Sequence, residues 1–177
     1  MKSNLQLKEM LAGDVIRSIG LTSRVADLVG SDQTLFDEVF EGIYSTDDIL
    51  RNRSAEAAEK AARAHPRLLE THKNEIIRNL PNYIHADVRW RISLMLGLLD
   101  MKGNQLSKAI SYLQLWLGEE KQVAIIANCI QSLAKYAEKN RWLRNEVIGI
   151  IEAQMERGSA GVKARGRNLL KALYRDK

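Results

Sequence analysis

The sequence of 177 residues has little cysteine, proline or phenylalanine: one, two and two residues, respectively. A lone cysteine, Cys129, cannot form an internal disulfide, which favours a reduced, cytoplasmic setting. Strand-forming residues are sparse, whereas Ala, Leu, Ile, Glu, Lys and Arg are abundant and tolerate helix well. We therefore expect a cytoplasmic, all-α protein. Its length suits one domain, spanning residues 1–177.

Long apolar runs are also missing. No stretch approaches the 18 or so apolar residues that a membrane-spanning helix needs. The first 13 residues carry Lys and Glu among their apolar positions, so they lack the core of a signal peptide. We expect no membrane partner.

Sequence motifs for catalysis and metal binding are absent too. The chain has no phosphate loop, no Gly-x-Ser-x-Gly and no His-Glu-x-x-His. Its three histidines, His65, His72 and His85, do not stand four residues apart as ligands on one helix face would. No two carboxylates form a recognisable acid/base pair. We expect no enzymatic activity, no cofactor and no metal.

The charge is positive and unevenly distributed. Residues 1–46 hold four basic and seven acidic side chains, and residues 47–177 hold 23 basic and 15 acidic ones. A basic surface can attract a polyanion. The other interpretation is an ordinary solvated helix face.

What the sequence does contain is a repeat. Four segments share one register, and their first residues are 38, 37 and 37 positions apart. They are Leu50-Arg51-Asn52-Arg53, Val88-Arg89-Trp90-Arg91, Ile125-Ile126-Ala127-Asn128 and Val162-Lys163-Ala164-Arg165. A period in this range on helical sequence predicts a stack of helix pairs. We expect about four repeats in residues 31–177 and a capping segment in residues 1–30.

Apolar spacing and helix breakers place the helices. They are predicted at Leu5–Leu11, Ser23–Val29, Asp32–Tyr44, Pro66–Leu80, Asp87–Asp100, Ser107–Gly118, Lys121–Lys139, Trp142–Arg157 and Ala160–Tyr174. A further helix should follow the N-cap candidates Ser45-Thr46-Asp47-Asp48 and run to about Ala64. The links are short, so neighbouring helices should be antiparallel.

Each repeated segment begins a buried stripe, because residues three and four apart share one face of a helix. One predicted stripe is Val88, Ile92, Met95, Leu96 and Leu99, and another is Val162, Gly166, Leu169, Leu170 and Leu173. In the first repeat the same positions hold Leu50, Ser54, Ala57, Ala58 and Ala61. These smaller side chains should let helices approach closely.

The segments from Asp87 to Leu99 and from Gly161 to Leu173 resemble the second helix of HEAT repeats. The stretch from Asp47 to Lys60, followed by His65-Pro66, resembles a group of small prokaryotic HEAT-repeat proteins with no assigned activity. The resemblance covers most of residues 31–177. It implies a right-handed α-α superhelix of the HEAT/armadillo-like solenoid kind.

In HEAT repeats, the basic residue after the first apolar one pairs with an acidic residue of a neighbouring repeat. The resemblance therefore implies structural roles for Arg51, Arg89 and Lys163. The third repeat departs from this pattern, because Ile126 occupies that position. HEAT-like repeats serve many partners, so the resemblance itself does not identify one.

The leading functional hypothesis is a non-enzymatic adaptor or scaffold that binds a protein or peptide on the face lined by the second helices. On an ideal helix, several apolar side chains of the two central repeats point away from their own buried stripes. An apolar strip of this kind can dock a helix or an extended peptide. The predicted partner-binding residues are Trp90, Leu94, Val123, Ala127 and Ile130, with Arg53, Arg91 and Arg165 at the rim. Packing against adjacent helices is the other interpretation of the strip.

The alternative function is nucleic-acid binding through phosphate contacts. Its predicted residues are Arg53, Arg91, Asn128, Lys163, Arg165, Arg167, Lys171 and Arg175. HEAT-like alkylpurine DNA glycosylases hold DNA with this architecture, so a DNA-repair enzyme is a distant third hypothesis. The chain shows neither their catalytic aspartate site nor an aromatic cleft. Trp116 and Trp142 are interpreted as core or hairpin-corner anchors.

Overall fold

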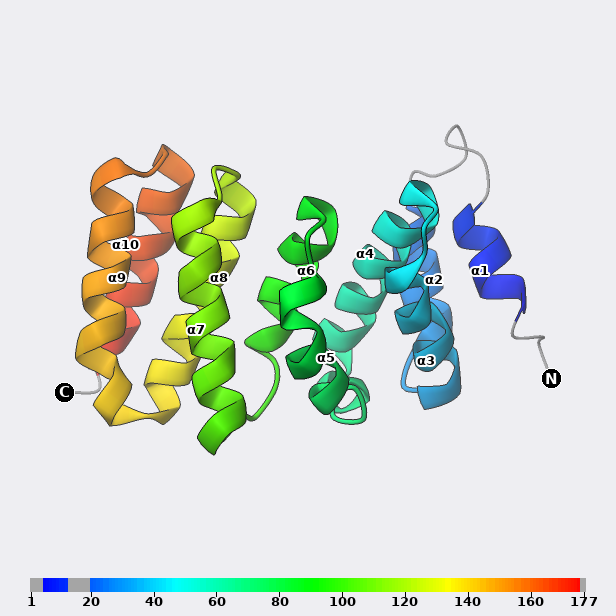
Figure 1. The fold of residues 1–177 in the computed structure, drawn as a ribbon, viewed down its shortest axis with the longest axis horizontal. Helices are drawn as coiled ribbons and strands as arrows, with labels where there is room; N and C mark the ends of the chain where they lie inside the picture. The colour runs from blue at the N-terminus through cyan, green and yellow to red at the C-terminus, as the bar shows by residue number, and fades with distance from the viewer. Residues whose placement is uncertain (1–4, 13–19, 176–177) are drawn as a thin grey trace. The chain divides into compact units, whose positions relative to one another are not determined.

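The computed structural model describes residues 5–12 and 20–175, and this part of the chain is helical with no strand. The α-helices are α1 (Leu5–Ala12), α2 (Leu21–Val29), α3 (Gln33–Glu41), α4 (Asp48–Ala64), α5 (Lys73–Asn79), α6 (Ala86–Leu96), α7 (Gly103–Glu119), α8 (Val123–Lys139), α9 (Arg144–Arg157) and α10 (Ala160–Arg175). Short 3-10 helices are η2 (Gly42–Tyr44), η3 (Pro66–Leu69), η4 (Leu80–Asn82) and η5 (Arg141–Leu143). Figure 1 shows their order along the chain. The expected all-α class is confirmed.

Capping residues in the sequence explain where α3 and α4 begin. Asp32 accepts a hydrogen bond from the Leu35 backbone N–H at 3.1 Å, and Asp47 accepts one from Leu50 at 2.8 Å. Such bonds satisfy amide groups that have no partner within the first turn of a helix. His65, which precedes Pro66, ends α4 as expected, because a residue before proline avoids the helical conformation.

The helix expected over Pro66–Leu80 is not continuous. The chain instead forms η3, a turn, α5 and η4. Bonds to α3 hold the turn: the Gln33 side-chain amide donates to the Leu68 carbonyl at 3.2 Å and to the Thr71 hydroxyl at 2.9 Å. These tertiary bonds compete with continuation of the helix. The helix expected over Asp87–Asp100 also ends early, at Leu96.

The repeat register is visible in the helix boundaries. Leu50, Val88, Ile125 and Val162 are each the third residue of their helix, which is α4, α6, α8 and α10, respectively. The 37- to 38-residue period therefore corresponds to one helix start per repeat. Whether the repeats build a superhelix stays a prediction.

The chain divides into two compact units. Unit 1 is residues 1–99 and unit 2 is residues 100–177. In unit 1, α4 is the central element and packs against α1, α2, α3 and α6. In unit 2, α8 packs against α7, α9 and α10 (Figure 1).

The core of unit 1 uses small side chains on α4. Ala57, Ala58 and Ala61 are all buried, as the stripe predicts. A Cβ added to Gly42 would lie 2.1 Å from the hydroxyl oxygen of the buried Ser54. The backbone after α3 therefore approaches α4 at a distance that only glycine permits. The predicted close approach of helices in the first repeat is present at this point.

The core of unit 2 contains Trp116, the largest of the fully buried side chains among the described residues. Trp116 is 1% exposed and Cys129 is fully buried. The predicted stripe on α10 is only partly buried, because Leu169 and Leu170 keep some exposure. Trp142 is 69% exposed in η5, so it is a corner residue and not a core residue. None of the helices within the described ranges is long and apolar enough to span a membrane.

Candidate functional site

A cavity of about 370 Å³ lies in unit 1 where the chain enters α4 and α6. We call it the tyrosine pocket. It is lined by Ile43, Tyr44, Ser45, Thr46, Asp48, Arg51, Asn82, Tyr83, Ile84, His85 and Val88. These residues come from two segments, 43–51 and 82–88, that precede or begin α4 and α6.

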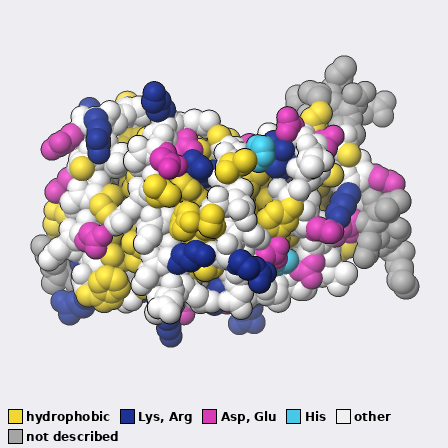
Figure 2. All heavy atoms as spheres, in the orientation of Figure 1, with side chains coloured by type: hydrophobic (Ala, Val, Ile, Leu, Met, Phe, Trp, Pro, Cys, Tyr) yellow, Lys and Arg dark blue, Asp and Glu magenta, His cyan; other side chains and the backbone are white. Residues whose placement is uncertain are grey.

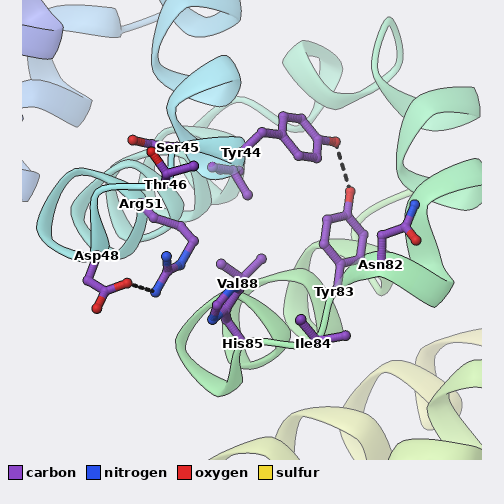
Figure 3. Close-up of a pocket in the computed structure, with 11 residues that line it drawn as sticks. Tyr44, Ser45, Thr46, Asp48, Arg51, Asn82, Tyr83, Ile84, His85 and Val88 are labelled. Atoms are coloured by element: carbon purple, nitrogen blue, oxygen red, sulfur yellow. Dashed lines mark hydrogen bonds and ion pairs between the residues drawn. The ribbon is translucent and has the colours of Figure 1, made fainter.

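Two tyrosines form one wall of the pocket. The hydroxyls of Tyr44 and Tyr83 point toward one another, with their oxygens 3.0 Å apart (Figure 3). The rings are nearly parallel, with centroids 6.3 Å apart and an interplanar angle of 21°. The Asn79 side-chain amide donates to the Tyr44 hydroxyl at 3.3 Å. The pair joins the end of η2 to the end of η4 and shapes the wall.

Burial raises the pKa of the Tyr83 hydroxyl far above its usual range, and Tyr44 and Glu75 raise it further. Burial also raises the pKa of Tyr44, although its hydrogen bonds with Tyr83 and Asn79 oppose the shift. Both phenols therefore stay protonated at neutral pH. They can donate and accept hydrogen bonds, but they do not supply a phenolate nucleophile or base.

Arg51 forms the charged side of the pocket. Its side chain is 9% exposed, and a terminal nitrogen lies 2.7 Å from an Asp48 carboxylate oxygen, as Figure 3 shows. Its Nε lies 3.6 Å from a carboxylate oxygen of Asp87 on α6. Arg51 thus contacts one acidic residue in the first turn of α4 and one in the first turn of α6. The two carboxylates balance its charge, so the pocket is not a strong anion site.

The rim of the pocket has exposed apolar surface. Ile84 is 71% exposed and Tyr44 is 41% exposed. The half-buried Ser45 and the exposed Thr46 and Asn82 add hydroxyl and amide groups beside them. An apolar contact flanked by a few polar groups is typical of a ligand-binding surface. Among the described residues, no group of three or more His, Cys, Asp or Glu side chains could hold a metal ion.

The residues of the predicted apolar strip are divided between the units. In unit 1, Trp90 is 36% exposed and Leu94 is partly exposed. In unit 2, Val123 is 45% exposed and Ala127 partly exposed, but Ile130 is fully buried. Ile130 therefore belongs to the buried interior and not to an accessible surface.

Arg53 and Arg91, predicted for both functions, are engaged inside unit 1. Arg53 is 9% exposed and donates to the Leu11 carbonyl oxygen at 2.7 Å. The guanidinium of Arg91 lies 3.6 Å from Glu56, 3.8 Å from Glu59 and 3.9 Å from the centre of the Trp90 ring. Neither side chain is available to a partner in this arrangement, because both are used in packing α4.

In unit 2 the predicted basic residues differ in exposure. Asn128 is 8% exposed, so it cannot continue a basic surface. Arg165, which is bonded to the Gln131 side chain, is nevertheless exposed. The other predicted residues of α10 are the partly exposed Lys163 and the exposed Arg167, Lys171 and Arg175. On the face drawn in Figure 2, basic and acidic side chains are interspersed with hydrophobic ones.

Sequence reasoning did not find the tyrosine pocket. Its best signal is the pair Tyr44 and Tyr83, which lie within the links that precede α4 and α6. Ile84 is a second signal, because it is a large aliphatic residue in a short polar link. Periodicity assigns faces only within helices, so it carries no information about the side chains of links.

Comparisons of the chain with protein-family models, with curated proteins and with solved structures found no match.

Proposed function

We propose that this chain is a HEAT-like helical-repeat protein that binds an extended segment of a protein partner, without catalysing a reaction on it. The observation that carries the proposal is the tyrosine pocket, with the exposed Ile84 at its rim. Equivalent helix starts in four positions support the HEAT-like assignment. The proposed binding place is the N-terminal ends of α4 and α6.

The chemistry of the pocket specifies the kind of segment. An apolar side chain of the partner would pack on Ile84 and the Tyr44 ring, where surface is now in water. Ser45, Thr46 and Asn82 would bond the backbone of the partner. A folded helix would satisfy its own backbone, so these polar groups favour an extended peptide.

A peptide selection tests the proposal. The full chain is panned against a phage-displayed library of random peptides, and an enriched peptide is measured by fluorescence anisotropy. Burying an isoleucine side chain contributes about 1.5–3 kcal/mol, so Ile84→Asp should weaken binding by about 10-fold or more. Leu115→Asp is the matched control, because Leu115 is 48% exposed in unit 2. Failure to enrich any peptide, or equal binding by the Ile84 variant, would contradict the proposal.

Polyanion binding by α10 is a second candidate, favoured by the exposure of Arg165, Arg167, Lys171 and Arg175. Unit 2 holds 14 basic and eight acidic residues, a net charge of +6. Contacts with phosphates release counterions, so binding to random duplex DNA should weaken steeply with salt.

The test of this second candidate is charge reversal. Arg165, Arg167 and Lys171 are changed together to Glu, and DNA binding is measured from low to physiological salt. The control reverses three exposed arginines of unit 1, Arg24, Arg67 and Arg78. Loss of DNA binding in the α10 variant alone would support binding by the basic face of α10. Equal loss in both variants, or no DNA binding by the wild type at low salt, would contradict it.

A further inference from the structure

One side of α10 is exposed along the whole helix. Within unit 2, α10 packs against α8 and α9 (Figure 1). Residues three, four and seven apart share one side of a helix, so six residues of α10 lie within about 100° of arc. All six are exposed, and we call this side the open face: Ala160, Ala164, Arg167, Asn168, Lys171 and Arg175.

The equivalent side of α8 belongs in part to the core. Counted from the start of the repeated segments, Arg167 corresponds to Ile130 and Lys171 corresponds to Ala134. Ile130 and Ala134 are fully buried, whereas Arg167 and Lys171 are exposed. The same two helix positions are therefore core in α8 and surface in α10.

Part of that side of α8 is covered by α10 itself. The Arg165 side chain donates a hydrogen bond to the Gln131 side chain on α8. A Cβ built on Gly161 would lie 3.7 Å from a methyl group of Val123, in ordinary van der Waals contact. Val123 precedes Ile130 by seven residues, so both lie on the same side of α8. A further helix on the open face would pack on α10 as α10 packs on α8.

The open face carries positive charge. Arg167, Lys171 and Arg175 follow one another at intervals of four residues, so they form one basic ridge along α10. Among the residues that the structure describes, none of these three is in an ion pair with an aspartate or glutamate. The ridge can therefore accept acidic groups from another molecule without first breaking such a pair.

Apolar side chains flank the basic ridge. The half-buried Leu170 and the 44%-exposed Tyr174 lie along one side of it, and the exposed Ala160 and Ala164 lie along the other. The Tyr174 hydroxyl donates to a Glu152 carboxylate oxygen on α9 at 3.2 Å, which holds the ring beside the ridge. The small alanines let another helix approach closely, because the distance between packed helices depends on the side chains at the contact.

We propose that the open face of α10 is a docking surface for an acidic amphipathic helix of a partner protein. Carboxylates at intervals of four residues on that helix would pair with Arg167, Lys171 and Arg175. Its apolar side chains would cover Leu170 and Tyr174, as in the docking of amphipathic helices on apolar surfaces. This docking is independent of peptide binding at the tyrosine pocket, which lies in unit 1.

Duplex DNA, the second candidate above, would use the same basic ridge. Its phosphates would match Arg167, Lys171 and Arg175, but a phosphate backbone offers no apolar partner to Leu170 and Tyr174. The apolar flank therefore favours a helix over DNA.

A pair of synthetic helices tests the proposal on the wild-type chain. The first is a short hydrocarbon-stapled peptide with leucines and glutamates on adjacent ridges, and the second has glutamine in place of every glutamate. Binding of each labelled helix to the full chain is measured by fluorescence anisotropy at low salt. We expect the glutamate helix to bind about 10-fold more tightly, because it alone can form three ion pairs with the basic ridge. Equal binding of the two helices, or no binding of the glutamate helix, would overturn the proposal.

Charge reversal then locates the binding site. Changing Arg167 and Lys171 together to Glu should weaken binding of the glutamate helix by about 10-fold or more, because repulsion replaces attraction. The matched control reverses two exposed basic residues of unit 2 outside α10, Lys121 and Arg141. Equal weakening in the control variant would show that only the net charge of unit 2 matters, and it would contradict docking on the open face.

Two further measurements separate this proposal from the two candidate functions. Ile84→Asp, which alters the rim of the tyrosine pocket, should bind the glutamate helix as the wild type does. Loss of helix binding in this variant would place the helix at the tyrosine pocket and overturn the proposal. Random duplex DNA is measured on the same chain. A wild type that binds DNA but neither helix would overturn helix docking and support DNA as the occupant of the open face.

Discussion

In unit 1, three basic residues of the repeated segments, Arg51, Arg53 and Arg91, are buried or nearly buried. Their guanidinium groups contact residues of α1, α4 or α6. In unit 2, Arg165, at the fourth position of the last repeated segment, remains exposed. Unit 1 has 13 basic and 14 acidic residues, whereas unit 2 has a net charge of +6. The equivalent positions of Arg53, Arg91 and Arg165 are therefore buried in unit 1 and exposed in unit 2, and the buried ones are held by a carbonyl oxygen or by carboxylates of neighbouring helices.

The largest effect should come from breaking the buried ionic cluster of unit 1. Arg91→Met leaves Glu56 and the 3%-exposed Glu59 side chain without one of their cations. Removing one partner of a buried pair costs about 3–5 kcal/mol, and we expect about 3 because Arg63 still contacts Glu59. Urea unfolding of the wild type and the variant measures this loss in the free energy of unfolding. Arg167→Met in unit 2 should stay within about 0.5 kcal/mol.

This cluster also gives a pH dependence. Burial raises the pKa of Glu56, but Lys60 and Arg91 outweigh it, so the pKa is lowered. The stability from this carboxylate is present above its unfolded pKa of about 4.3 and is lost as the pH falls through the folded value. The destabilisation by Arg91→Met should therefore shrink in acid. A cost that is as large at pH 3 as at pH 7 would contradict this explanation.

A smaller effect should come from adding one methyl group at equivalent close approaches. Gly42→Ala forces contact with Ser54, whose Cβ lies 2.8 Å from the new atom, and should cost about 1–3 kcal/mol. Gly166→Ala on α10 meets the sulfur of Met155 at 2.4 Å, but this side chain is flexible. Alanine also favours helix over glycine by about 0.5–1 kcal/mol, so the Gly166 variant should be nearly neutral. Thermal melts that rank the two variants the other way would show that the approach in unit 1 is not rigid.

The smallest effect should come from an exposed ion pair in unit 2. Lys139 and Asp100 lie 3.1 Å apart with side chains 60% and 57% exposed. Exposed pairs contribute about 0.2–1 kcal/mol and are screened by salt. Asp100→Asn should therefore shift the urea midpoint slightly at low salt and hardly at all at high salt. A loss that persists at high salt would mean that Asp100 does more than pair with Lys139.

The sequence was sufficient for the all-α class and for the register of four helix starts, but not for every helix, since the one expected over Pro66–Leu80 is interrupted. Leu50, Val88, Ile125 and Val162 could be aligned because buried apolar positions recur at a fixed distance from each helix start. The exposure of charged residues could not be predicted this way. Arg53 is buried because Leu11, 42 residues earlier, offers a carbonyl oxygen, and no periodicity encodes that contact.

The candidate site was missed for a related reason. The tyrosine pocket is built from links, and the chain direction in a link is set by tertiary contacts such as the Tyr44–Tyr83 hydrogen bond. Ile130 shows the opposite error, since its helical angle predicted an outward face but it is fully buried. A helical wheel shows which side chains share one face of a helix, but it does not show whether a neighbouring helix covers that face.

The burial of Cys129 gives unit 2 a built-in reporter. It is the only thiol in the chain and is fully buried on α8, so a thiol reagent can modify it only when α8 is exposed by opening. Under conditions of rapid reclosing, the modification rate measures the free energy of that opening. Without any added label, local opening of unit 2 can thus be followed in a native, unmutated protein.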